Sequence, residues 1–263
     1  MSFDPYDYSL LTVFVFSIAV FAASIEIGRL FAARTKGRDR GGSQVTTLEA
    51  AMLGLLALLI GFTFSMALYH YDMRRGELLT EANAIGTTAL RARLLPAPHD
   101  LTVLKLLREY AQIRLDVTEP AASVTTLKTA LDRSRGIHEA LWQQATAVAA
   151  KTGEMVPTGL FIETLNNLID SEEKRLTALR YRVPHIVLIE LYGLTAAVLA
   201  FAGYVNAVER PRSRLQVYVV SIVISCVLLL VQDLDRPIAG FISVNQQPMI
   251  DTADSIAAMI GNR

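Results

Sequence analysis

Three carboxylic acids lie in or beside long apolar runs of this 263-residue chain, namely Glu26, Glu49 and Glu190. Glu26 has Arg29 three positions later, on the same face of a helix, so we expect a local ion pair. Glu49 stands at the start of its run, where water can reach it. Glu190 lies deeper, and no basic residue stands three or four positions from it. Because a carboxylate within a membrane is costly and usually functional, Glu190 is the candidate intramembrane carboxylate, with an interhelical hydrogen bond near the interface as the alternative.

The other reactive side chains form no enzyme signature. The four histidines are scattered singly, and the sequence contains no HExxH, CxxC, GxSxG or phosphate-binding glycine loop. The single cysteine, Cys226, excludes an intrachain disulfide. We interpret His70 and Asp72 as a solvated pair and Trp142 as part of a core. The chain is therefore predicted not to be an enzyme and to need no metal or cofactor.

The composition indicates membrane spans joined to a water-exposed part. Apolar residues make up 52% of the chain and its mean hydropathy is +0.37, yet 19% of the residues are charged. The 25 basic and 25 acidic residues cancel, so no overall field attracts nucleic acid, and no nucleic-acid partner is predicted. We expect membrane lipid to surround the apolar spans.

Four segments are long and apolar enough to cross a bilayer core of about 30 Å, which takes about 20 residues of helix. They span residues 8–33, 48–71, 185–208 and 215–231. The first is preceded by acidic residues and is too long for a signal peptide, so we expect it to stay as an anchor. The fourth is rich in β-branched residues, and a buried strand is its alternative. Its tight turn from the third span favours a helical hairpin.

The segment between the second and third spans, residues 72–184, follows a helical period. Ser123 is a candidate helix N-cap, and Pro120 and Gly153 are candidate helix ends. The tail 250–260 reads as an amphipathic helix whose apolar face, expected to be buried, includes Ile250 and Ile256. Because the polar face of the tail is acidic, we expect it to dock on the protein and not on anionic lipid. The predicted fold is all-α, with four transmembrane helices and a helical-bundle insert. We predict four segments: a first transmembrane hairpin (1–71), the helical insert (72–184), a second transmembrane hairpin (185–232) and a C-terminal tail (233–263).

No proline occurs between Pro5 and Pro96, so the second span is predicted to continue as one helix from about Leu48 to Leu95. Its last part carries small residues that allow close helix packing. Glu81 reaches no basic residue one turn away, so we expect its partner to come from another element. This part is predicted to be a packing joint made of Glu81, Ala82, Asn83, Gly86, Ala89 and Arg91.

Two stretches carry a family resemblance. LGLLALLIGFTFSMALYHYDMRRGELLTEANAIGTTALRARLLP surrounds the end of the second span, and QDLDRPIAGFISVNQQPM follows the fourth. Together they resemble the bestrophin-like bacterial membrane family, and more distantly the bestrophins, which are pentameric anion channels. The resemblance implies a homo-oligomer that conducts an inorganic anion, with the second span lining the pore. The pore-lining residues would be Leu56, Ile60 and Phe64, unless these side chains simply face lipid or neighbouring spans.

This sequence matches the acidic calcium-binding clasp of bestrophins only in part. Asp233 and Asp235 supply only two carboxylates, whereas calcium takes six to eight oxygen ligands.

The short basic loops predict the orientation. Basic residues cluster around positions 29–40 and 210–214, so the positive-inside rule leaves the termini and the insert on the periplasmic or extracellular side of a bacterial inner membrane. The bestrophin arrangement implies a cytosolic insert instead. As a different class of function, a non-conducting sensor or scaffold whose insert binds a partner or ligand remains the alternative to a channel.

Overall fold

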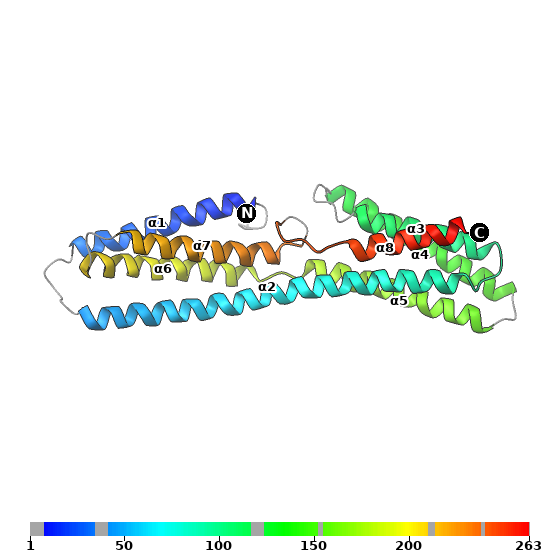
Figure 1. Ribbon diagram of the computed structural model, residues 1–263, viewed down its shortest axis with the longest axis horizontal. Coiled ribbons are helices and arrows are strands. Elements are labelled where there is room, and N and C mark those ends of the chain that lie inside the picture. The colour runs from blue at the N-terminus through cyan, green and yellow to red at the C-terminus, as the bar shows by residue number, and fades with distance from the viewer. Residues whose placement is uncertain are drawn as a thin grey trace. The chain divides into compact units, whose positions relative to one another are not determined.

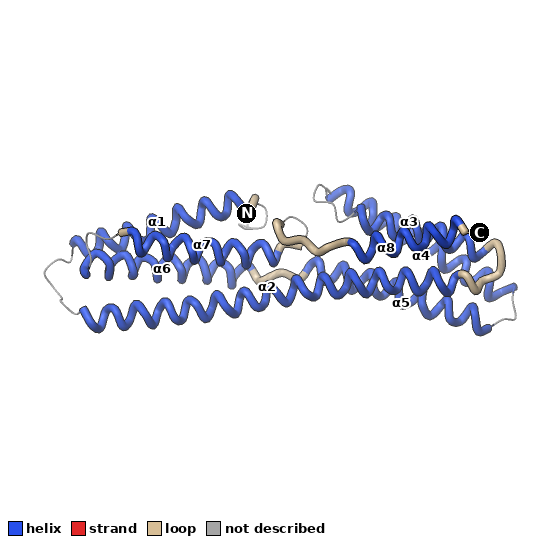
Figure 2. The backbone as a smooth tube through the Cα atoms, in the orientation of Figure 1, coloured by secondary structure: helices blue, strands red, loops and turns tan. Residues whose placement is uncertain are grey.

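The computed structural model describes residues 8–34, 42–116, 124–151, 155–209, 214–237 and 240–262. Within these ranges every regular element is a helix, as Figure 2 shows, so the all-α prediction is confirmed. The predicted cap at Ser123 and the predicted ends at Pro120 and Gly153 lie outside the described residues. The helices are α1 Leu10–Arg34, α2 Gly42–Ala92, α3 His99–Asp116, α4 Val124–Lys151, α5 Met155–Arg180, α6 His185–Glu209, α7 Leu215–Asp235 and α8 Gln247–Gly261.

Four stretches of helix in the described chain are long and apolar enough to cross a membrane, and they fall on α1, α2, α6 and α7. The four predicted spans are therefore confirmed. The fourth span is a helix, Leu215–Asp235, and not the alternative strand. An isolated strand in lipid would leave its backbone amides and carbonyls without partners, whereas a helix pairs them internally.

Helix α2 is continuous over 51 residues, from Gly42 to Ala92. At 1.5 Å per residue it is about 76 Å long. The prediction of one helix from the second span into the insert is confirmed, although the helix starts six residues earlier than expected and ends three residues earlier. Gly76 lies within it without interrupting it, since one interior glycine costs only about 1 kcal/mol.

The chain divides into two compact units. The first comprises residues 1–70, 182–236 and 240–242, and the second comprises 71–181, 237–239 and 243–263. In the first unit α1 lies beside α6 and α7 (Figure 1). Its core joins side chains from four helices: Phe21, Ile25, Leu56, Leu191, Val198, Leu199 and Leu228.

Helices α1 and α6 approach each other unusually closely. A Cβ atom placed on Gly28 would lie 1.7 Å from the carbonyl oxygen of Ala200, and one placed on Gly203 would lie 2.3 Å from that of Ile25. Only hydrogen fits between these backbones, so the two glycines are required by the packing.

The second unit is a bundle of the C-terminal part of α2 with α3, α4, α5 and α8 around one apolar core. The tail is a helix that buries Met249 and Ile256 in this core, which confirms that it docks on the protein. Ile250, expected on the buried face, is exposed, because Met249 takes the place beside Ile256. Trp142, expected in the core, is also exposed, and Leu141 beside it is buried.

Candidate functional site

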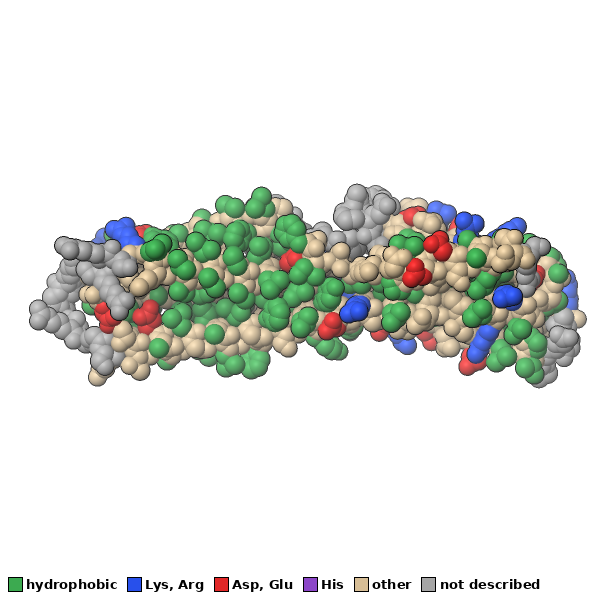
Figure 3. All heavy atoms as spheres, viewed as in Figure 1, with side chains coloured by type: hydrophobic (Ala, Val, Ile, Leu, Met, Phe, Trp, Pro, Cys, Tyr) green, Lys and Arg blue, Asp and Glu red, His purple; other side chains and the backbone are tan. Residues whose placement is uncertain are grey.

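Helix α2 leaves a row of large apolar side chains uncovered in the first unit. Leu58, Phe62 and Met66 are 53%, 63% and 40% exposed and follow one another at intervals of four. Leu56 and Thr63, which lie on another side of the helix, are buried. In the face shown in Figure 3, hydrophobic side chains also gather over α1 and α7. The first unit therefore offers lipid or neighbouring subunits an apolar surface.

The three predicted pore-lining residues are not equivalent. Leu56 is only 1% exposed and packs in the core of its own unit, with Phe21 and Leu191. Ile60 packs against the same core and is half-buried, as is Phe64. Of this stripe, Leu56 has no free surface to present to an axial pore.

Asp233 and Asp235 use their carboxylates to hold loops. Asp233 accepts hydrogen bonds from the backbone amides of Phe241 at 2.7 Å and Ile242 at 3.0 Å. Asp235 accepts the amide of Val183 at 2.9 Å. Both side chains are buried, so the two acids fix the chain after α7 and before α6. A Cβ atom on Gly240 would lie 2.5 Å from Asp233 Oδ1, so a larger residue here would displace the Asp233 side chain.

His70 and Asp72 do not form the expected pair. His70 Nδ1 lies 3.0 Å from Asp235 Oδ1, while Asp72 is exposed on α2. This contact could not be predicted from sequence spacing, because 165 positions separate the two residues.

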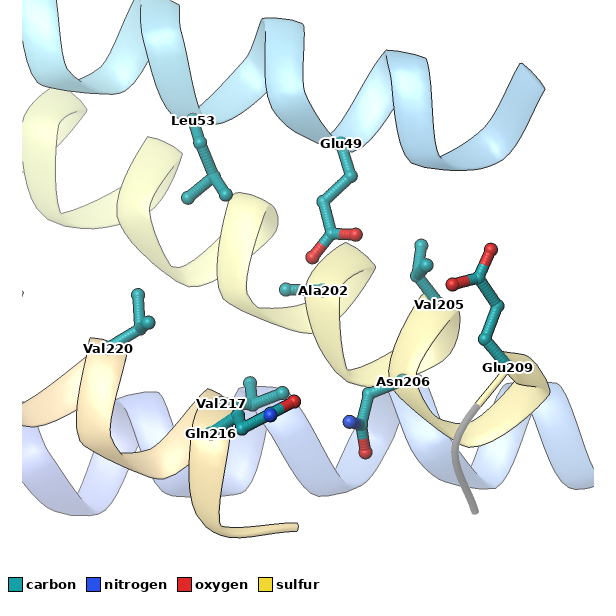
Figure 4. Close-up of a pocket in the computed structure, with 9 residues that line it drawn as sticks. All are labelled: Glu49, Leu53, Ala202, Val205, Asn206, Glu209, Gln216, Val217 and Val220. Carbon is teal, nitrogen blue, oxygen red and sulfur yellow. The ribbon is translucent and has the colours of Figure 1, made fainter. Parts of the chain in front are cut away.

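The three acids in or beside the apolar spans differ in their surroundings. Glu26 lies 3.8 Å from Arg29, which confirms the predicted local pair, and it also accepts the hydroxyl of Tyr218. Glu190 is exposed on α6. Glu49 and Glu209 both line a pocket of mixed polarity, about 220 Å³ in volume, between α2, α6 and α7 (Figure 4).

A network of charged groups is buried in the second unit. Glu81 Oε1 lies 2.8 Å from Arg114 Nε and accepts the hydroxyl of Tyr110 at 2.7 Å, and Glu81 Oε2 accepts Arg175 Nη1. Arg114 Nη1 donates to Glu172 at 3.3 Å. Glu81 thus has partners from α3 and α5, as its sequence position required.

The network extends to α4 and to the segment before α8. His138 Nε2 lies 3.2 Å from Glu172 Oε2, and its ring packs on that of Tyr110. Arg175 Nη2 donates to the side-chain carbonyl of Gln246 at 3.1 Å. Burial, followed by the nearby Arg114 charge, lowers the pKa of His138 to about 4. Burial also raises the pKa of Glu172. Two acids and two arginines therefore balance one another beside a neutral histidine.

The other residues of the predicted packing joint also lie in the second unit. Ala82 and Ala89 are buried in its core. Arg91 donates to Glu163 at 2.9 Å and to the carbonyl oxygen of Leu160 at 2.7 Å. Gly86 faces the Thr252 side chain of α8, whereas Asn83 is exposed.

Comparison with known proteins relates this architecture to one family. A search among curated proteins finds no match. The crystal structure of a bacterial bestrophin homologue from Klebsiella pneumoniae is similar, with a TM-score of 0.65 at 15% identity, covering 97% of this chain and 98% of that chain. A mutant of a Klebsiella pneumoniae homologue gives a TM-score of 0.67 at 14% identity, covering 94% and 97%. These likenesses concern the fold. A family model for the bestrophin-like domain matches residues 12–249, and the chain therefore belongs to the bestrophin-like family.

Proposed function

We propose that this membrane protein assembles into a homo-oligomer that conducts ions through an axial pore lined by α2. The exposed apolar row of α2 carries the proposal, because one face of this long helix is covered by its own subunit and another face is free. The likeness of the fold to bestrophin homologues supports it. The choice of an inorganic anion rests on the resemblance of the sequence to bestrophin channels.

The narrow part of the pore is proposed to lie at Leu58, Phe62 and Met66. This row has the same spacing as Leu56, Ile60 and Phe64, but it lies on the uncovered side of α2. Rings of such side chains from several subunits would form a constriction that gates by dewetting. Glu190, exposed on α6, is proposed to meet a neighbouring subunit or the water at the membrane interface.

Recording from the purified protein in planar bilayers tests the proposal. We expect discrete, anion-selective currents from a preparation whose mass, measured in nanodiscs, corresponds to three or more chains. A well-folded dimer without conductance would contradict it and would favour the non-conducting sensor or scaffold.

The insert is proposed to face the periplasmic or extracellular side of the bacterial inner membrane, as the basic loops require. Leu94, which follows α2, is exposed and suits a reporter thiol. In a Cys226→Ser background, Leu94→Cys should react with an impermeant maleimide in intact cells. Labelling only after lysis would place the insert in the cytosol, in accord with the bestrophin arrangement.

A further inference from the structure

A mostly apolar pocket of about 570 Å³ lies between α1 and α6 in the first unit. Its walls run from Thr12 to Val20 on α1 and from Leu188 to Ala196 on α6, which is about 12 Å of each helix. The volume falls within the range of about 300–1,000 Å³ that is usual for small-molecule sites. Within the described chain, no charged side chain lines it.

One side chain of this lining is polar, buried and unpaired. Gln232 of α7 is 2% exposed, and neither its Nε2 nor its Oε1 has a hydrogen-bond partner. Buried amides are almost always paired, because each unmade hydrogen bond costs about 1–3 kcal/mol. Gln232 therefore brings one unpaired donor and one unpaired acceptor to the lining of the pocket.

Gln232 lies beside the beginnings of α1 and α6. The neighbouring Asp235 accepts the backbone amide of Val183, just before α6, and Arg236 donates to the carbonyl oxygen of Tyr8, just before α1. The polar group thus lies at the end of the pocket where both helices begin, and the apolar walls extend from it towards Val20 and Ala196.

We propose that this pocket binds a single-chain fatty acid with its neutral carboxyl group on Gln232. The carboxyl oxygen would accept from Nε2 and the carboxyl hydroxyl would donate to Oε1, so both amide groups would be paired. A phosphate headgroup fits less well, because its charge would lack a basic partner in the lining. A helix of a second copy would satisfy the amide only through a side chain, because its backbone groups are bonded internally.

Photolabelling of the whole protein in nanodiscs with diazirine-bearing palmitic acid tests the site. Gly193 lies in the lining and a Cβ atom on it meets no other group within 4 Å, so Gly193→Leu can place its side chain in the pocket and narrow it. Ala197→Leu, one turn later and exposed outside the lining, is the matched control. We expect adducts on α1 and α6 that fall at least about tenfold in Gly193→Leu and less than about twofold in the control.

The polar contact is tested with the methyl ester of the same probe, which lacks the hydroxyl donor. Wild-type protein should prefer the acid over the ester by about tenfold, and Gln232→Leu should abolish this preference. Equal labelling by acid and ester, or labelling unchanged in Gly193→Leu, would overturn the proposal. Wild-type protein that forms no adducts on α1 or α6 would do so too. The site does not depend on conduction, so a silent channel leaves this test intact.

Discussion

The network around Glu81 joins three helices of the second unit, α2, α3 and α5, through one carboxylate. Both oxygens of Glu81 are engaged, by Arg114, Tyr110 and Arg175, and the side chain is fully buried. Removing one member of such a network leaves the opposite charges buried and uncompensated, which is far more costly than losing a surface pair.

Glu81→Gln should therefore destabilise the protein by about 3 kcal/mol or more. Chemical unfolding in detergent micelles measures the effect. Glu163→Gln is the matched control, because Glu163 pairs with Arg91 at the surface and its side chain is 62% exposed; its loss should cost less than about 1 kcal/mol. Similar losses in the two variants would show that burial does not determine the strength of the Glu81 contacts.

His138 should make stability depend on pH. Its pKa is about 4 in the folded protein and 6.5 in its ordinary state, so between these values the unfolded chain binds more protons. The stabilisation is fully present above pH 6.5 and is lost as the pH falls towards 4. The raised pKa of Glu172 acts in the opposite direction, and a comparison of two proteins that both keep Glu172 removes this contribution.

The measurement is thermal unfolding of wild type and His138→Gln between pH 7 and 4.5. The stability of the wild type relative to the variant should fall as the pH falls. If the stabilities of the two proteins changed in parallel with pH, keeping His138 neutral would have no effect on the free energy of unfolding.

At the scale of elements, the contact between α1 and α6 depends on glycine. Gly28→Ala would drive a methyl group into the Ala200 carbonyl, so the helices must separate, and we expect a loss of about 2–3 kcal/mol. Gly54→Ala on α2 meets open space and should be neutral or stabilising by up to about 1 kcal/mol. Unfolding in micelles compares the two, and a Gly28→Ala variant as stable as Gly54→Ala would contradict this close packing.

Most helices could be predicted because local patterns specify them. Apolar runs of spanning length marked α1, α6 and α7, and the absence of proline marked the continuity of α2. The tail helix followed from its apolar face, although Met249, not Ile250, proved to be buried.

The buried network was less predictable, because its partners are far apart in the sequence. A signal was nevertheless present. Arg114 continues the apolar row of Leu104, Leu107 and Ala111 on α3, and Arg175 lies seven residues after the buried Leu168 on α5. A charged side chain on a row that otherwise faces a core indicates a buried partner of opposite sign, here Glu81 for both arginines. The contact of His70 with Asp235 had no such periodic signal.

At the scale of the whole molecule, membership of the bestrophin-like family and the exposed face of α2 support the proposed function, in which subunits would surround a pore and large apolar side chains of α2 would narrow it. Phe62 and Phe64 separate this account from its nearest rival. They are two residues apart and point about 200° away from each other around the helix, so they cannot both face the axis.

The most direct test is the conductance of Phe62→Ala and Phe64→Ala channels in planar bilayers. Shortening Phe62 should widen the constriction and raise the unitary conductance or relax anion selectivity by about twofold or more, whereas Phe64→Ala should leave both near wild type. A change in Phe64→Ala alone would assign the pore to the stripe of Leu56, Ile60 and Phe64. Unchanged currents from both variants would contradict a pore narrowed by α2.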